Sequence, residues 1–100
     1  MIDFEHSRVF ADWLNSLADT IGKARIVARI RAAEHGNFGD TASVGDSVFE
    51  MRVHHGPGYR VYFSRRDEVV YLLLVGGDKS SQKRDIKRAV QMVRNIGNQE

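Results

Sequence analysis

The chain has 100 residues, of which 42% are hydrophobic and 28% charged, and a formal net charge of +2. These proportions predict one globular domain, residues 1–100, with a single modest core. The absence of cysteine excludes disulfides and thiolate metal sites and fits a reducing cytoplasm. No apolar run reaches the roughly 18 residues of a membrane span, and there is no signal-peptide core. The sequence therefore predicts a cytoplasmic protein without membrane contact.

The charge is distributed unevenly along the chain. Residues 1–50 carry five Lys/Arg and eight Asp/Glu, a balance of −3, whereas residues 51–100 carry ten and five, a balance of +5. A basic second half favours a nucleic acid or an acidic protein as partner.

The first half of the chain predicts a short edge strand at residues 1–5 and two helices. Ser7 is a plausible N-cap for the first helix, whose apolar stripe repeats every three to four residues as far as Ile21. The second helix is expected over residues 23–34 and ends at Gly36. The polar residues 37–47 are interpreted as a loop.

The second half predicts three strands and a final helix. Residues 48–54 and 59–64 alternate between apolar and polar side chains, as in strands with one buried face. Residues 69–75 are apolar at both parities, which is typical of a central strand covered on both faces. A last helix, capped by Asp78, Ser80 or Ser81, has a core stripe from Ile86 to Ile96 and stops at Gly97.

This order predicts an α+β fold with two N-terminal helices packed on a small antiparallel sheet, followed by a C-terminal helix. The two N-terminal helices are expected to cover one face of the sheet. The opposite face would remain partly open as a groove, with the polar side chains of the hairpin as its floor.

The turn at residues 55–58, His-Gly-Pro-Gly, predicts that residues 48–64 form a hairpin. A three-residue loop keeps the apolar side chains on one face. It places His54 opposite Arg60, Arg52 opposite Tyr62 and Glu50 opposite Ser64. One face of the sheet would then carry two arginines, a histidine, a tyrosine and a carboxylate within about 5 Å of their cross-strand neighbours.

Basic side chains are the first candidates for chemistry. Arg52, Arg60 and Lys79 would clamp a phosphodiester and stabilise charge in a transition state, and the alternative is a solvated ladder of ion pairs with Glu50. His54 and His55 are candidate general bases, and the alternative is a histidine beside a turn that tolerates exposure.

Other polar groups have weaker signals. Tyr62 is a candidate for stacking on a base or for proton transfer. The basic face of the last helix, with Lys83, Arg84 and Lys87, would contact an RNA backbone, although such a face is more often only solvated. Gly76 and Gly77 before a helix are a weak signal for an anion site. No HxxxH or HExxH spacing occurs, so neither a metal nor a cofactor is expected.

Two long runs, FEMRVHHGPGYRVYF and LLLVGGDKSSQKRDI, together with FADWLNSL and NFGD, resemble the RelE/ParE toxin superfamily in its HigB-like branch of addiction module killer proteins. The resemblance covers nearly the whole chain. By motif, Arg60 of GYR matches the phosphate-binding arginine of that family, and Arg52 matches a basic residue of the preceding strand that assists catalysis. Lys79 of GGDK lies near the position of a basic residue after the last strand.

The resemblance implies a toxin of a type II toxin–antitoxin system that cuts mRNA on the ribosome as a metal-independent endoribonuclease and inhibits translation. A cognate helix-turn-helix antitoxin, encoded next to it, would neutralise the toxin, and operator DNA would be bound only through the toxin–antitoxin complex. The alternative is a ParE-like inhibitor of DNA gyrase without nuclease activity. No histidine follows His55, and Glu50 stands where RelE-like sequences carry a lysine, which favours this alternative.

Overall fold

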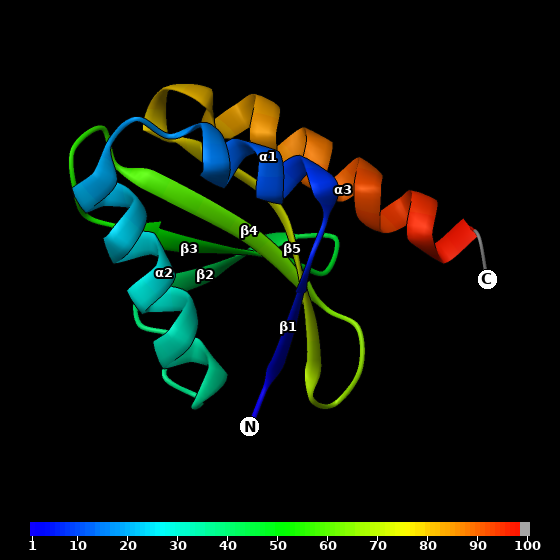
Figure 1. Ribbon diagram of the computed structural model, residues 1–100. Coiled ribbons are helices and arrows are strands. Elements are labelled where there is room, and N and C mark those ends of the chain that lie inside the picture. The colour runs from blue at the N-terminus through cyan, green and yellow to red at the C-terminus, as the bar shows by residue number, and fades with distance from the viewer. Residues whose placement is uncertain (99–100) are drawn as a thin grey trace.

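The computed structural model describes residues 1–98 and contains five strands and three α-helices, shown in Figure 1. In chain order the elements are β1 (Asp3–His6), α1 (Arg8–Ser16), α2 (Thr20–Glu34), β2 (Thr41–Gly45), β3 (Val48–Val53), β4 (Tyr59–Arg65), β5 (Val70–Asp78), the single 3₁₀ turn η1 (Lys79–Ser81) and α3 (Gln82–Asn98). The predicted α+β class is confirmed. None of these helices is long and apolar enough to cross a membrane.

The five strands form one mixed sheet in the order β1-β5-β4-β3-β2. The predicted edge strand at the N-terminus is confirmed, but β1 runs parallel to β5, so the sheet is not purely antiparallel as expected. Its ends are fixed by backbone hydrogen bonds from Asp3 N to Val69 O and from Ser7 N to Leu73 O. The four residues of β1 do not indicate the direction of the strand, because side chains alternate in the same way in parallel and antiparallel pairs.

The interpretation of the polar residues 37–47 as a loop holds for residues 37–40 but is wrong for residues 41–45. Residues 41–45 form β2, which pairs with β3 at the edge of the sheet. The following turn uses positive φ at three successive positions, Gly45, Asp46 and Ser47. An edge strand needs little apolar burial, so a run of small polar residues can pair its backbone without the alternation that marks an inner strand.

Both faces of the sheet are covered by helices, which corrects the expectation of an open face. On one face, Phe10 and Ile26 from α1 and α2 pack with Met51 and Val61 of the sheet. On the other face, Ala89 of α3 packs with strand residues, with Ile86, Val90 and Val93 beside it. The apolar stripe of the last helix is thus confirmed, and it is this stripe that closes the second face. The prediction that β5 is covered on both faces is also confirmed, although β4 is the central strand.

The first helix ends earlier in the chain than its apolar stripe predicts. The Ser7 N-cap is confirmed by its hydrogen bond from Phe10 N, but α1 ends at Ser16 and α2 begins at Thr20. Asp19 caps α2 by accepting a hydrogen bond from Gly22 N at 2.9 Å. Ile21 therefore belongs to α2 and is 61% exposed instead of continuing the stripe of α1. At the other end of α2, His35 is the C-cap and Gly36 follows with a φ of +90°.

Gly76 and Gly77 lie inside β5 and do not form an anion-binding loop. A β-carbon on Gly76 would overlap the ring of Trp13, and one on Gly77 would overlap the Asp85 carboxylate. The two glycines therefore allow α1 and the start of α3 to approach β5 from opposite faces.

Gly76→Ala is expected to destabilise the fold by about 1–3 kcal/mol, the usual cost of overpacking a filled core. Its φ lies outside the left-handed region, so the overlap with Trp13 is the cause. Urea denaturation measures the change, and an unaltered unfolding midpoint would show that α1 moves away without cost.

Candidate functional site

The hairpin register differs from the prediction by two residues. Arg52 lies opposite Arg60, and Glu50 lies opposite Tyr62. The connection comprises residues 54–58, in which His55 N donates to Val53 O and Gly58 N to His55 O. A shift of two residues keeps every side chain on its face, so the alternating pattern cannot distinguish the two registers. The predicted polar face is retained, but its two arginines are now direct neighbours.

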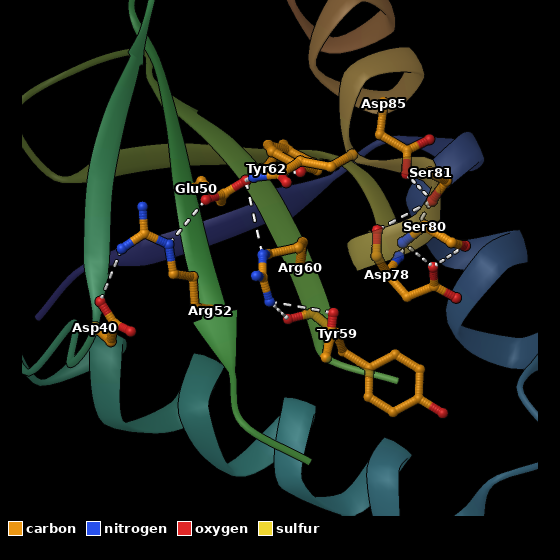
Figure 2. Close-up of polar contacts among 12 residues, drawn as sticks. Asp40, Glu50, Arg52, Tyr59, Arg60, Tyr62, Asp78, Ser80, Ser81 and Asp85 are labelled. Atoms are coloured by element: carbon orange, nitrogen blue, oxygen red, sulfur yellow. Dashed lines mark hydrogen bonds and ion pairs between the residues drawn. The ribbon is translucent and has the colours of Figure 1, made fainter. Parts of the chain in front are cut away.

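A buried carboxylate, Glu50, organises the polar side chains at this end of the sheet, shown in Figure 2. Its side chain is only 1% exposed and accepts hydrogen bonds from Arg52 Nε at 2.9 Å, Tyr62 Oη at 2.9 Å and Gln82 Nε2 at 2.8 Å. Burial acts to raise the pKa of Glu50, but these three hydrogen bonds outweigh it and hold the pKa below its ordinary 4.5. Glu50 is therefore an ionised acceptor that compensates the positive charge of the arginines.

Arg60 lies across from Arg52 with a side chain that is 11% exposed. Its Nη1 donates to the carbonyl oxygens of Gly58 and Tyr59, and its Nε is 3.9 Å from Glu50 Oε2. That Nε is buried without a hydrogen-bond partner. Within the described part of the chain Nη2 makes no hydrogen bond either, so this guanidinium retains donor capacity for an anion.

Arg52 is held between two carboxylates. Besides Glu50, it contacts Asp40, with Nη1 at 3.3 Å from Oδ1, and the arginine side chain is 36% exposed. The hydrogen bond with Glu50 raises the pKa of Arg52. Nε and Nη1 are thus occupied, whereas Nη2 makes no hydrogen bond within residues 1–98.

His54 makes a close contact with the same aspartate, with Nε2 at 2.6 Å from Asp40 Oδ2. The hydrogen bond with His54 is the main reason why the pKa of Asp40 lies below its ordinary 3.8, and Arg52 adds to this effect. Asp40 was not among the predicted site residues, because it lies in the segment interpreted as a loop. The pairing of β2 with β3 brings it to the hairpin.

A hollow of about 460 Å³ lies at the end of the hairpin. It brings together three of the five residues predicted to be catalytic, Arg60, Lys79 and His54. The other lining residues form the turn, His55, Gly56, Pro57 and Gly58. Because a backbone turn, two histidines and two cations line one hollow, the arrangement can bind an anion and move a proton beside it.

Tyr62 does not reach this hollow. The residue is fully buried, and its hydroxyl donates to Glu50. Burial, together with the adjacent carboxylate, strongly raises the pKa of Tyr62. The predictions that Tyr62 stacks on a base or transfers a proton to the leaving group are contradicted, because α3 covers the face that was expected to be open. Its contact supports Glu50 instead.

The end of the hairpin is attached to the start of α2 through Asp19. Tyr59 Oη donates to Asp19 Oδ2 at 2.8 Å, and His55 Nε2 lies 3.5 Å from the same oxygen. The cap of α2 therefore also holds the turn that lines the hollow, and His55 is engaged in this structural contact.

The basic residues of the last helix lie beside the hollow. Lys83, Arg84 and Lys87 are exposed, and a second hollow of about 510 Å³ is lined by Lys83 and Arg84 together with residues 79–82. Lys79 lines both hollows. Asp78 caps η1 by accepting a hydrogen bond from Ser80 N at 2.8 Å. The positive charge of this surface therefore comes from the lysine and arginine side chains and not from a free helix N-terminus. Lys87 is one turn farther along and lines neither hollow.

Among residues 1–98, no group of three or more His, Asp or Glu side chains is arranged to hold a metal ion. The site is instead built from arginine–carboxylate pairs. No sequence pattern indicates the role of Gln82, whose amide joins α3 to Glu50, because this role depends on where α3 crosses the sheet.

Comparison with known proteins places these residues in a family. Residues 12–94 match the model of the phage-derived Gp49-like proteins (DUF891). The chain belongs to this Gp49-like family. An uncharacterized protein of Haemophilus influenzae is 44% identical over 96 residues, which is 96% of this chain and 97% of that protein.

The Gp49-like assignment agrees with the toxin-like, RelE-type module that the sequence resembles. The matched residues include β2 to β5 and most of α3, so the hairpin, Glu50 and the hollow all lie within the family region.

Proposed function

We propose that this Gp49-like protein is the toxin of a type II toxin–antitoxin system and cuts mRNA on the ribosome in the cytoplasm. The observation that carries the proposal is the convergence of Arg60, Lys79 and His54 on one hollow. In-line attack of a ribose 2′-oxygen on the adjacent phosphorus needs a positioned phosphate, a base and charge stabilisation. The HigB-like resemblance supports the same reaction.

In this mechanism the 2′-oxygen bonds to phosphorus while the bond to the 5′-oxygen breaks. Arg60 holds the phosphate oxygens, and His54 accepts the proton of the 2′-hydroxyl. Lys79 stabilises the charge on the leaving 5′-oxygen, which takes a proton from solvent. Arg52 joins the clamp through Nη2, which makes no hydrogen bond within residues 1–98, and its contact with Asp40 is kept. Lys83, Arg84 and Lys87 bind neighbouring backbone phosphates.

The partners follow from the reaction. The ribosome and mRNA present the substrate, and an antitoxin of the helix-turn-helix type, encoded beside the toxin, neutralises it. Operator DNA is bound only through that complex. The basic surface around the hollow favours an acidic antitoxin segment.

Expression without the antitoxin is expected to arrest growth, and co-expression of the neighbouring antitoxin is expected to relieve the arrest. Primer extension on transcripts after induction should then find cuts at fixed codon positions. Normal growth in the presence of folded protein would contradict an active toxin.

The second candidate is a ParE-like gyrase inhibitor. It is favoured by the burial of Tyr62 and by the engagement of Arg52 with Glu50 and Asp40, which reduce the number of free catalytic groups. DNA breaks with induction of the SOS response, and intact transcripts, would support this candidate over the nuclease.

A further inference from the structure

The contact between Asp40 and His54 has a chemical consequence for the proposed reaction. The His54 side chain is 72% exposed, and its one hydrogen bond within the described part of the chain is the 2.6 Å contact from Nε2 to Asp40 Oδ2. An ionised carboxylate only accepts hydrogen bonds. Asp40, whose pKa is lowered mainly by this same contact, is ionised at neutral pH. Nε2 must therefore carry the hydrogen.

Asp40, whose side chain is 42% exposed, contacts Arg52 through both its backbone and its carboxylate. Its carbonyl oxygen accepts from Arg52 N at 2.9 Å, and its Oδ1 contacts Arg52 Nη1 at 3.3 Å. Arg29 reaches across from α2, with Nη2 donating to Phe38 O at 2.9 Å and Nη1 donating to Arg52 O. The residues just before β2 are thereby fixed to the end of β3. The backbone of Asp40 is thus fixed where its carboxylate reaches His54 Nε2.

We propose that Asp40 is a positioning residue that holds His54 in the Nε2–H tautomer, leaving Nδ1 unprotonated as the atom that removes the proton from the ribose 2′-hydroxyl. This inference rests on the proposed ribonuclease function. In a neutral imidazole the hydrogen bond of one nitrogen sets the state of the other. His54 lines the same hollow as Arg60, so its base would act beside the clamped phosphate. The proton passes from the 2′-oxygen to Nδ1 as the oxygen–phosphorus bond forms.

The tautomer can be read directly from ¹⁵N chemical shifts of the imidazole in the full-length protein at the pH of the cleavage assay. The expected result is an Nε2–H signal for His54 in the wild type. Asp40→Asn is expected to give a mixture of tautomers, because an amide can either donate or accept. An Nδ1–H tautomer or an imidazolium in the wild type would overturn the inference, whether or not the protein cleaves RNA.

Cleavage of ribosome-bound mRNA supplies the second readout. General base catalysis typically contributes about 100- to 10,000-fold. We expect His54→Ala to lose most of this factor and Asp40→Asn to lose about 10-fold or more, with partial rescue in Asp40→Glu. Adding Asp40→Asn to His54→Ala should have no further effect. If Asp40 had only a structural role, Asp40→Asn would lower the rate both in the wild type and in His54→Ala, and that result would overturn the inference.

Asp46→Asn is the matched control. Asp46 is an exposed aspartate in the turn after β2, and it contacts Arg94 at 3.5 Å, away from the hollow. This change removes the same charge and should leave both the tautomer and the rate unchanged. If the wild type fails to cut mRNA on ribosomes, the proposed function fails, whereas the His54 tautomer separately decides the role of Asp40.

Discussion

Arg60→Ala is expected to lower the rate of mRNA cleavage on the ribosome about 100- to 1000-fold, the usual loss on removal of one preorganised donor from a transition state. Arg60 lines the hollow at the hairpin, and its Nη2 is unused within the described part of the chain. A planar guanidinium can bind two phosphate oxygens at once, which an ammonium group cannot, so Arg60→Lys should restore activity only in part. Single-turnover cleavage and growth of the expressing strain measure the effect.

The structure changes what this substitution should do to stability. From the sequence, Arg60 is a surface residue whose loss would alter stability by no more than about half a kcal/mol. The side chain is in fact 11% exposed, hydrogen-bonded to two carbonyl oxygens and 3.9 Å from Glu50. Some destabilisation of Arg60→Ala is therefore expected, and rates must be compared below its unfolding transition.

Arg65→Ala is the matched control for Arg60→Ala. Arg65 lies on the same strand, but it is exposed and donates to the turn carbonyls of Asp67 and Glu68. Removing this positive charge should leave cleavage unchanged. If Arg60→Ala is folded and remains fully toxic, the phosphate clamp is wrong and the gyrase candidate gains support.

The sequence predicts the inner elements of this fold well. The alternation of residues 48–54 and 59–64 identifies β3 and β4, and Ser7 identifies the start of α1. These features are local, since they depend on side-chain period and on capping of the nearest turn. The apolar stripe from Ile86 to Ile96 also identifies α3, but not the face of the sheet on which it packs.

The site was predicted less well, because its contacts depend on geometry that a linear pattern does not encode. The hairpin register was wrong by an even number of residues, to which alternation is insensitive. Asp40 reaches His54 only because the weakly patterned β2 pairs with β3. Tyr62 has the spacing of an exposed residue, but α3 covers it. Residue types thus indicated the chemistry of the hairpin, while pairing and helix packing decided which groups face the hollow.

Glu50→Ala is expected to destabilise the fold by about 3 kcal/mol, near the lower end of the range for removing one partner of a buried ion pair. The change leaves the donors of Tyr62 and Gln82 without their acceptor, and leaves Arg60 without its nearby carboxylate. The lower end applies because the Arg52 side chain is 36% exposed, so its charge can be solvated. Urea denaturation near pH 7 measures the loss, and Glu5→Gln on the exposed edge of β1 is the control.

Measuring stability at acidic pH tests Glu50 without the cavity that Glu50→Ala creates. Because the folded state lowers the pKa of Glu50 below its ordinary 4.5, the unfolded state binds more protons as the solution is acidified. This contribution of Glu50 to the free energy of unfolding is complete above about pH 4.5 and is lost as the pH falls through the folded pKa. Glu50→Gln keeps the shape of the side chain but should show a shallower loss of stability below this pH than the wild type. Equal slopes in the two proteins, or a loss below 1 kcal/mol in Glu50→Ala, would show that the arginines are held in place without Glu50.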